Sequence, residues 1–488
     1  MSATISRRCF LETTAVGVMS SGAGRAQMGR PSAAAPLAEL IPKTKVRVGI
    51  VYLGRARPGW PSSTMDLDAE IKRYEAEMAR LPALAGVEFV PGGLVSTAEQ
   101  LVSAKERLKD VSGILVIHLT LGTGSLIEGL LDLSVPVTIF TMPYSGHEWH
   151  IVAGWQRQGR LIDVVPSSRY EDIALAVRPF LAIQRLRQSR ILHISQGEAQ
   201  PEYTSTIKDK FGTEIISLRL PDLQKAFDEA DRGEAQADAN RWMREAKRIV
   251  EPTKDEILKG SLMYVAMKNL LARHRAVAIT MNCLGMGLID RGMGYPCLGF
   301  VRLNNALLAG VCEADLKSAM TQLIFTYLVG RTGFVTDPVF DLSNDTIIHA
   351  HCVAATQMEG PDKPAAAYHI RSHLEDNKGV SLQVKMPVGQ KISMARLIGA
   401  DIMLFSTGDA VDSPFVERGC RSKLSVRVVN PTRFLENWSC GLHRVIFYGD
   451  HTRDISRFCR FMKIRLLREG VDDLQNVQGL EWETRVHA

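Results

Sequence analysis

Several signatures that would assign this chain to a common class of protein are missing from its 488 residues. The first apolar run, residues 46–52, continues as Leu53-Gly54-Arg55-Ala56 and not as G-x-G-x-x-G, which weighs against a dinucleotide cofactor. Residues 121–125 are glycine-rich but lack the following Gly-Lys of a phosphate loop. No G-x-S-x-G elbow is present, and no segment approaches the ~18 uninterrupted apolar residues of a membrane span. We therefore expect no nucleotide-cofactor residues and no membrane partner.

Cysteine is scarce and shows no pairing pattern. Cys9 lies near the N-terminus, and seven more follow in the second half of the chain: Cys283, Cys297, Cys312, Cys352, Cys420, Cys440 and Cys459. An odd number without a C-x-x-C pair argues against a disulfide framework and against a zinc knuckle. The apolar surroundings of Cys297, Cys312 and Cys352 favour core packing over nucleophilic roles. A single disulfide near the C-terminus stays open as an alternative.

Charge is nearly balanced. Lysine and arginine number 59 against 53 acidic residues, which gives a net charge of +6 at pH 7. The basic residues form no run, so they indicate a solvated surface and no nucleic-acid partner. A hydrophobic content of 45% with 23% charged residues is typical of a soluble globular protein. The length predicts two to four domains.

The N-terminus carries an export pattern. Residues 6–11, Ser-Arg-Arg-Cys-Phe-Leu, match the twin-arginine signal and precede a weakly apolar stretch. Gly24-Arg25-Ala26 offers a cleavage site, which predicts a mature start near Gln27 and a periplasmic or exported protein. A basic tail without a targeting role is the alternative. Twin-arginine export carries folded proteins, which would let a weakly bound metal such as Mn²⁺ be loaded before Cu²⁺ or Zn²⁺ competes for it.

The order of apolar runs predicts a mixed fold. Short buried strands alternate with helices as far as about residue 345, which predicts two doubly wound, Rossmann-like α/β domains with parallel sheets. Short strand-like runs then follow, typical of a β-rich barrel or sandwich, and a final helix is expected over 454–467. The predicted divisions are a signal and linker at 1–44, α/β domains at 45–172 and 173–345, and a β-rich domain at 346–488.

Two carboxylates and two imidazoles stand beside or within apolar runs in the second half of the chain. They are Glu313, Asp337, His351 and His443, and Glu313 follows a strand directly where a helix begins. Open α/β sheets place ligands at that edge. Such a set suits a divalent first-row ion, most simply Mn²⁺, with positions left for substrate. The carboxylates also supply acid and base groups.

The local sequence around these four residues is more informative than the residue types alone. The four stretches are L-A-G-V-C-E-A-D (308–315), G-F-V-T-D-P (333–338), I-I-H-A-H-C (347–352) and G-L-H-R-V-I-F-Y-G-D-H (441–451). Further pieces are P-C-L-G-F-V-R-L-N-N (296–305), Y-H-I-R-S-H-L-E-D (368–376) and Y-S-G-H-E-W-H (144–150). Together they resemble the fucose/arabinose isomerase superfamily, most closely its L-fucose-isomerase-like branch, over nearly all of the chain after residue 44.

The resemblance implies a role for each residue. Glu313 and Asp337 match the paired catalytic carboxylates that also bind the metal, and His443 matches the metal histidine of the C-terminal domain. His351 matches a further histidine ligand of the arabinose branch. One departure is visible, because the familiar G-N-H reads G-L-H here. The family's oligomers imply a trimer or hexamer with sites near subunit contacts, so the loop with His147 and Trp149 is expected to face substrate, in its own subunit or a neighbouring one.

Other polar residues have competing interpretations. Asp315 is expected to cap its helix and to point away from the site. Asp337 could be a turn residue before Pro338, and His349 is expected to be structural. Arg371, His373 and Glu375 alternate as on one strand face. We expect Arg371 and His373 to bind substrate hydroxyls, with a surface ladder of charges as the alternative.

These features together predict an exported, metal-dependent aldose–ketose isomerase, an intramolecular oxidoreductase, that acts on a monosaccharide through a cis-enediol. A non-catalytic exported sugar-binding protein is one alternative, because fold does not fix function. A metal-dependent epimerase or lyase with the same enediolate chemistry is another.

Overall fold

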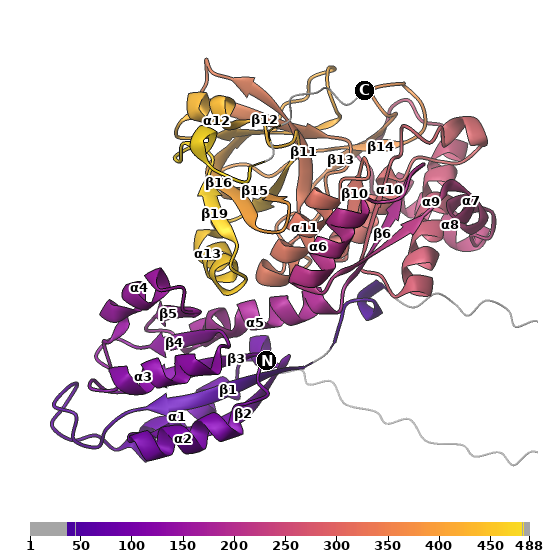
Figure 1. Ribbon diagram of the computed structural model, residues 1–488. Coiled ribbons are helices and arrows are strands. Elements are labelled where there is room, and N and C mark those ends of the chain that lie inside the picture. The colour runs from indigo at the N-terminus through magenta and orange to yellow at the C-terminus, as the bar shows by residue number, and fades with distance from the viewer. Residues whose placement is uncertain (1–36, 44, 481, 483–488) are drawn as a thin grey trace, which may run out of the picture. The chain divides into compact units, whose positions relative to one another are not determined.

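The computed structural model describes residues 37–43, 45–480 and 482. These residues form two parallel α/β sheets and a closed six-stranded antiparallel β-barrel, which follow one another along the chain (Figure 1). The predicted combination of α/β units with a C-terminal β-rich unit is confirmed at this level, and the β-rich unit is a barrel. The predicted signal segment and most of the linker lie outside the described residues. Among the described helices, none has the length and apolar character that a membrane crossing requires.

The first sheet has five parallel strands in the order β2-β1-β3-β4-β5. Every residue of β3 is buried, as expected for a parallel strand covered on both faces. The strands are β1 (Val46–Leu53), β2 (Val87–Val95), β3 (Gly113–His118), β4 (Val137–Thr141) and β5 (Ile162–Pro166). One face packs against α1 (Leu67–Met78) and α5 (Ile173–Arg187), and the other against α2 (Ala98–Arg107), α3 (Gly124–Leu130) and α4 (Trp149–Arg157).

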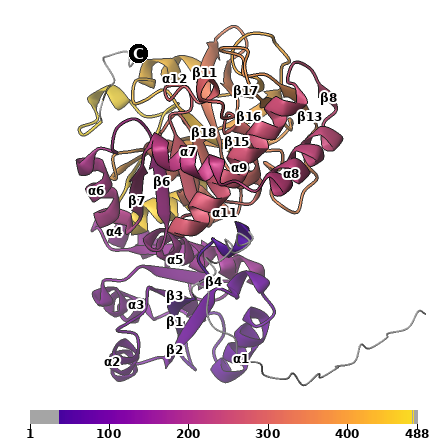
Figure 2. The ribbon, with the colours of Figure 1, turned by 90° about the vertical axis from the view of Figure 1, so that its right-hand side faces the viewer.

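The second sheet has four parallel strands in the order β10-β9-β6-β7. They are β6 (Arg190–Ile194), β7 (Glu214–Leu218), β9 (Ala278–Met281) and β10 (Ala309–Cys312). Its helices are α6 (Pro201–Phe211), α7 (Leu220–Asp228), α8 (Arg232–Glu245), α9 (Lys254–His274), α10 (Cys297–Asn305) and α11 (Leu316–Val329). Figures 1 and 2 both show α8 beside α9, which it contacts. α9 begins with a capping box between Thr253 and Glu256, and α11 ends at Gly330 in the left-handed conformation.

The barrel runs β15-β18-β11-β12-β17-β16 and closes through pairing of β16 with β15. Its strands are β11 (Phe334–Asp341), β12 (Thr346–His351), β15 (Lys391–Ile398), β16 (Ile402–Asp412), β17 (Ser422–Arg427) and β18 (Arg444–Tyr448). Closure leaves no free edge among the six strands, although β19 (Arg465–Arg468) adds to β16 in parallel. In sequence, α12 (Pro431–Asn437) lies between β17 and β18, and α13 (Thr452–Phe461) lies between β18 and β19.

Two local predictions are wrong. The expected final helix ends at Phe461, and its predicted last residues form β19, because pairing with β16 supersedes the helical pattern. The short β8 spans Arg248–Ile249. β8 joins a small sheet with β13 (Tyr368–Arg371) and β14 (Ser381–Val384). Since β13 ends at Arg371, residues 371, 373 and 375 do not alternate along one strand.

The carboxyl edge of the first sheet contains a buried ion pair. His118 Nε2 lies 2.8 Å from a carboxylate oxygen of Glu148, and the other oxygen accepts the backbone N–H of Thr123 at 2.6 Å. Burial alone would raise the pKa of Glu148, but the hydrogen bond and charge of His118 outweigh it and lower the pKa to about 2. Glu148 therefore anchors its loop to the sheet, while Trp149 remains half exposed at the surface.

Replacing Glu148 with Gln should destabilise the protein at pH 7 by about 2 kcal/mol. The folded-state pKa lies below the unfolded value, so this contribution is present above about pH 4.5 and is lost as the pH falls toward 2. Urea unfolding of the full chain at pH 7 and at pH 3 measures it. Glu171→Gln, an exposed change nearby, is the control. Equal midpoints for wild type and Glu148→Gln at pH 7 would contradict the assignment.

Candidate metal centre

Four side chains from distant parts of the sequence converge on one point. Glu313 follows β10, Asp337 lies on β11, His351 ends β12, and His443 precedes β18. One potential ligand atom from each residue can be chosen so that all four lie within 4.8 Å of one another. The two imidazoles are buried, whereas the Glu313 and Asp337 side chains are 40% and 28% exposed. The group is therefore open on its carboxylate side.

The barrel register brings three of the four together. Asp337 pairs with Ala350 on β12, and the neighbouring Thr336 pairs with Arg444 on β18. His351 and His443 are each the adjacent residue in those strands, so they flank Asp337 on its two sides. The prediction that both carboxylates come from the second α/β unit is wrong for Asp337, because β11 is a barrel strand. Only Glu313 is supplied by the parallel sheet.

Glu313 occupies a strained backbone position. Its φ is 62°, and that of Ala314 is 55°, so two consecutive residues with a Cβ adopt the left-handed conformation. Each such residue costs about 1–2 kcal/mol. The turn lies between the end of β10 and the start of α11. Strain of this kind persists where the surrounding structure requires a particular side-chain position.

The contacts within the group are close and favour ionised carboxylates. Glu313 Oε1 lies 3.4 Å from His351 Nε2, and Glu313 Oε2 lies 3.3 Å from His443 Nε2. Asp337 Oδ1 is 3.2 Å from the same nitrogen of His443. The two imidazoles beside Glu313 hold its pKa well below its usual range despite its partial burial. Glu313 is thus available as an anionic ligand at neutral pH.

Asp315 differs from expectation in one respect. It caps α11, as predicted, by accepting the backbone N–H of Ser318 at 3.0 Å. It does not point away from the site, because its Oδ2 accepts the Nδ1–H of His443 at 2.9 Å. The same oxygen accepts a hydrogen bond from Arg396 at 2.8 Å. A carboxylate on the far nitrogen fixes the tautomer and orientation of a metal-binding histidine.

Arg396 is a residue that the sequence reasoning missed. It lies on β15 and also donates to the backbone carbonyl of His443 at 3.3 Å. A Cβ at Gly441 would come within 2.5 Å of its guanidinium, so glycine is required there for close approach. The altered residue of G-L-H, Leu442, is about half exposed.

The two histidines present different nitrogens to the group. The backbone N–H of Cys352 donates to His351 Nδ1 at 2.9 Å, so the neutral ring carries its proton on Nε2. In that state His351 donates toward Glu313. Asp315 accepts the Nδ1–H of His443, so a neutral His443 ring has a bare Nε2. The geometry therefore favours Glu313, Asp337 and His443 as ligands, with His351 as a fourth only after it loses the Nε2 proton.

His349 is structural, as predicted. It is fully buried, its Nδ1 hydrogen-bonds Thr336 Oγ1 at 2.9 Å, and burial lowers its pKa to about 3. Thr336 in turn donates to the backbone carbonyl of Arg444. His349 thus ties β11, β12 and β18 together beside the converging group.

The group has the chemistry of a divalent-cation site. The Nε2 atoms of His351 and His443 are buried and lack a hydrogen-bond partner of acceptable geometry among the described residues. Buried polar atoms without partners are rare in native proteins and indicate a missing ligand. Two carboxylates and an imidazole at this spacing are a donor set that such a cation can join. The residues fit a metal ion, and their types do not fix which one.

The predicted substrate residue Arg371 is fully engaged elsewhere. Its five N–H groups bond to Glu251, Glu417 and Gln383 at 2.6–3.1 Å. These contacts connect β13 with residues before α9 and after β16, and they leave no donor for a substrate hydroxyl. Arg371 therefore has a structural role. His373 is buried beside Tyr295, with ring centroids 5.1 Å apart.

His147 and Trp149 lie at the carboxyl edge of the first sheet. They line a cavity of about 500 Å³ with Trp60, Tyr144 and Arg453, and the rings of Trp60 and His147 are 5.4 Å apart. None of the residues that line this cavity belongs to the converging group. Their contact with substrate stays a prediction.

All seven cysteines after residue 36 are free thiols in the part of the chain that the structure describes. Cys283 contacts the thiol of Cys312 and accepts the backbone N–H of Glu313, and these hydrogen bonds outweigh burial and lower its pKa to about 7. The predicted core positions of Cys297, Cys312 and Cys352 are confirmed, since each is buried. The alternative of a C-terminal disulfide is not observed among these residues.

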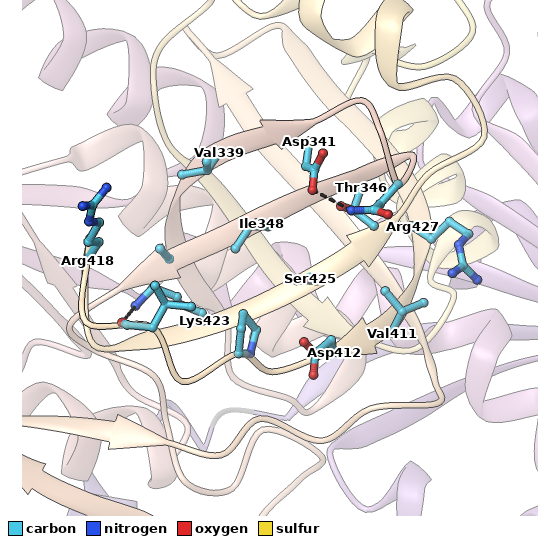
Figure 3. Close-up of a pocket in the computed structure, with 15 residues that line it drawn as sticks. Val339, Asp341, Thr346, Ile348, Val411, Asp412, Arg418, Lys423, Ser425 and Arg427 are labelled. Atoms are coloured by element: carbon cyan, nitrogen blue, oxygen red, sulfur yellow. Dashed lines mark hydrogen bonds between the residues drawn. The ribbon is translucent and has the colours of Figure 1, made fainter.

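A further cavity, of about 670 Å³, lies on the outer face of β11, β12, β17 and β16 (Figure 3). Val339, Ile348 and Val411 give it an apolar floor, and Arg418, Lys423 and Asp412 lie around it. Along β12, residues 346, 348 and 350 line this face, whereas His349 and His351 alternate with them and face the other side. None of the residues that line this cavity belongs to the converging group.

No protein-family model matches the chain, and no curated protein matches it.

Replacing His443 with Leu should lower manganese affinity at least about 100-fold, because a ligand is lost. His351→Leu should change it only a few-fold if this ring is a donor. Asp315→Asn should lower it roughly 10–100-fold. Equilibrium dialysis followed by elemental analysis measures all three.

The matched control is His274→Leu, at the end of α9 and away from the group. Equal losses in His351→Leu and His443→Leu would show a four-ligand site and contradict the tautomer argument. Undiminished binding in His443→Leu would contradict the metal centre itself.

Proposed function

We propose that this chain is a metal-dependent aldose–ketose isomerase acting on a monosaccharide through a cis-enediol. The supporting observation is the convergence of Glu313, Asp337 and His443 from two structural units onto one point. A pure sugar-binding site needs neither paired carboxylates nor a histidine oriented by a further carboxylate. Manganese is the proposed ion, because carboxylate-rich sets with open positions suit it.

The roles of the residues follow from their chemistry. A bound divalent cation would supply Lewis-acid polarisation of the substrate carbonyl. The Glu313 and Asp337 carboxyl groups are partly exposed, so either can remove the proton from the carbon beside the carbonyl and return it one carbon over. The Nε2–H of His351 can donate to a substrate oxygen, and Asp315 holds His443 in orientation.

Several finer assignments belong to the same proposal. The two parallel sheets would be Rossmann-like domains, and the protein would be exported through the twin-arginine route to the periplasm. A trimer or hexamer would place His147 and Trp149 near a substrate. His373 stays a proposed substrate residue, whereas Arg371 is withdrawn because its donors are all bonded within the chain.

Manganese-loaded protein should convert at least one aldose of a pentose, hexose and deoxyhexose panel into the matching ketose. Glu313→Gln should reduce kcat/KM by roughly 10²–10⁴, since it removes a ligand and an acid–base group together. Chromatography of the products and elemental analysis of each variant are the measurements.

Glu202→Gln, an exposed change on α6, is the control and should retain full activity. Sugar binding that survives chelation without turnover would favour the non-catalytic alternative. An epimer or cleavage product would favour the epimerase or lyase. Full activity in Glu313→Gln with full metal content would reject the assignment.

A further inference from the structure

A polar cavity of about 540 Å³ adjoins the metal centre on the side of the second sheet. Glu313, Asp315 and Arg396 form part of its wall. His193, Ser195 and Gln200 from the end of β6 and the following loop form another part. The volume lies in the range of small-molecule sites. Neither the catalytic nor the metal-binding roles described above use these last three residues.

The register of the sheet positions the two walls. His193 pairs with Thr280 on β9, and Thr280 pairs with Val311 on β10. His193 and Ser195 therefore lie level with Val311 and Glu313, two strands apart. Adjacent strands are about 4.8 Å apart, so the walls are separated by about 10 Å at the backbone. The gap opens at the carboxyl edge, where parallel sheets bind ligands.

His193 is an unusual residue for this position. It is 6% exposed, and its Nδ1 is buried without a hydrogen-bond partner among the described residues. Burial also lowers its pKa, so the ring is neutral at pH 7 and can both donate and accept. A neutral imidazole that lines a cavity suits a hydroxyl group, which has the same dual capacity.

The charges on the wall disfavour a phosphate. Glu198, Glu313 and Asp315 stand against Lys317 and Arg396, an excess of one negative charge. Arg396 is already paired with Asp315. Glu198 is likewise paired with Arg219, so the wall offers a dianionic phosphate no excess of positive charge, whereas a neutral polyhydroxylated chain needs none.

We propose that this cavity binds the distal hydroxyls of an unphosphorylated open-chain sugar and that His193 determines the preferred chain length. The proposal rests on the proposed function for the placement of the reacting end at Glu313. The distal end extends from there across the carboxyl edge of the sheet toward β6.

Linear alditols test the proposal without turnover. Erythritol, xylitol and sorbitol are titrated calorimetrically into manganese-loaded full-length protein. Wild-type affinity should rise roughly three- to tenfold for each added hydroxyl that is bonded. His193→Phe should abolish this rise and leave erythritol unchanged, and His193→Gln, which keeps a donor and an acceptor, should restore part of it. His274→Phe is the control, with metal content and thermal midpoint measured for every variant.

The outcomes separate the subsite from the isomerase. An equal loss for all three alditols in His193→Phe, no loss in any, or no alditol binding by wild type would overturn the subsite. Tighter binding of sorbitol 6-phosphate than of sorbitol would also overturn it. If the wild type converts an aldose but one of these results is obtained, the proposed isomerase function stands and the proposed subsite is rejected. A length-dependent rise that His193→Phe abolishes, without any ketose formation, would retain the subsite and reject the isomerase.

Discussion

The hydrogen bond between Asp315 and His443 is the contact on which the rest of the metal centre depends. Asp315 begins a helix of the second α/β unit, and His443 precedes a barrel strand, so one bond joins these two units. Arg396 reinforces it by contacting both partners. Arg444 adds a second support, because it donates to the carbonyl of His443 and forms a fully buried pair with Glu469. A buried charge pair of this kind contributes little net stability, but losing one partner is costly.

Each structural unit positions a different part of the site. The barrel register sets Asp337 between the two histidines, since strand pairing allows shifts only by whole residues. The parallel sheet supplies Glu313 at its carboxyl edge, together with the cavity that leads toward β6. Neither unit alone holds the complete group. Metal affinity should therefore report on the docking of the barrel against the second sheet as well as on the ligands themselves.

The sequence predicted the parts of this arrangement that local pattern encodes. Buried apolar runs located most strands of both sheets, and short local motifs identified the four converging side chains. Asp337 was assigned to the wrong unit, because strand partners are set by long-range pairing and β11 begins only a few residues after α11. The helix expected at 454–467 was cut short by pairing with β16. Arg371 looked free because Glu251 and Glu417, which bind it, lie more than 40 residues away in either direction. The proton on His351 depends on a backbone N–H, which side-chain types do not reveal.

The left-handed conformation of residues 313 and 314 limits which substitutions these two positions can accept during evolution. Glycine would relieve the strain at either position, and at 313 it would remove the carboxylate as well. At position 313, selection for thermal stability therefore favours glycine, whereas selection for a charged group at this turn favours glutamate. The side chain of Ala314 supplies no ligand, so Ala314→Gly is the change that could raise heat resistance without altering the chemistry of Glu313.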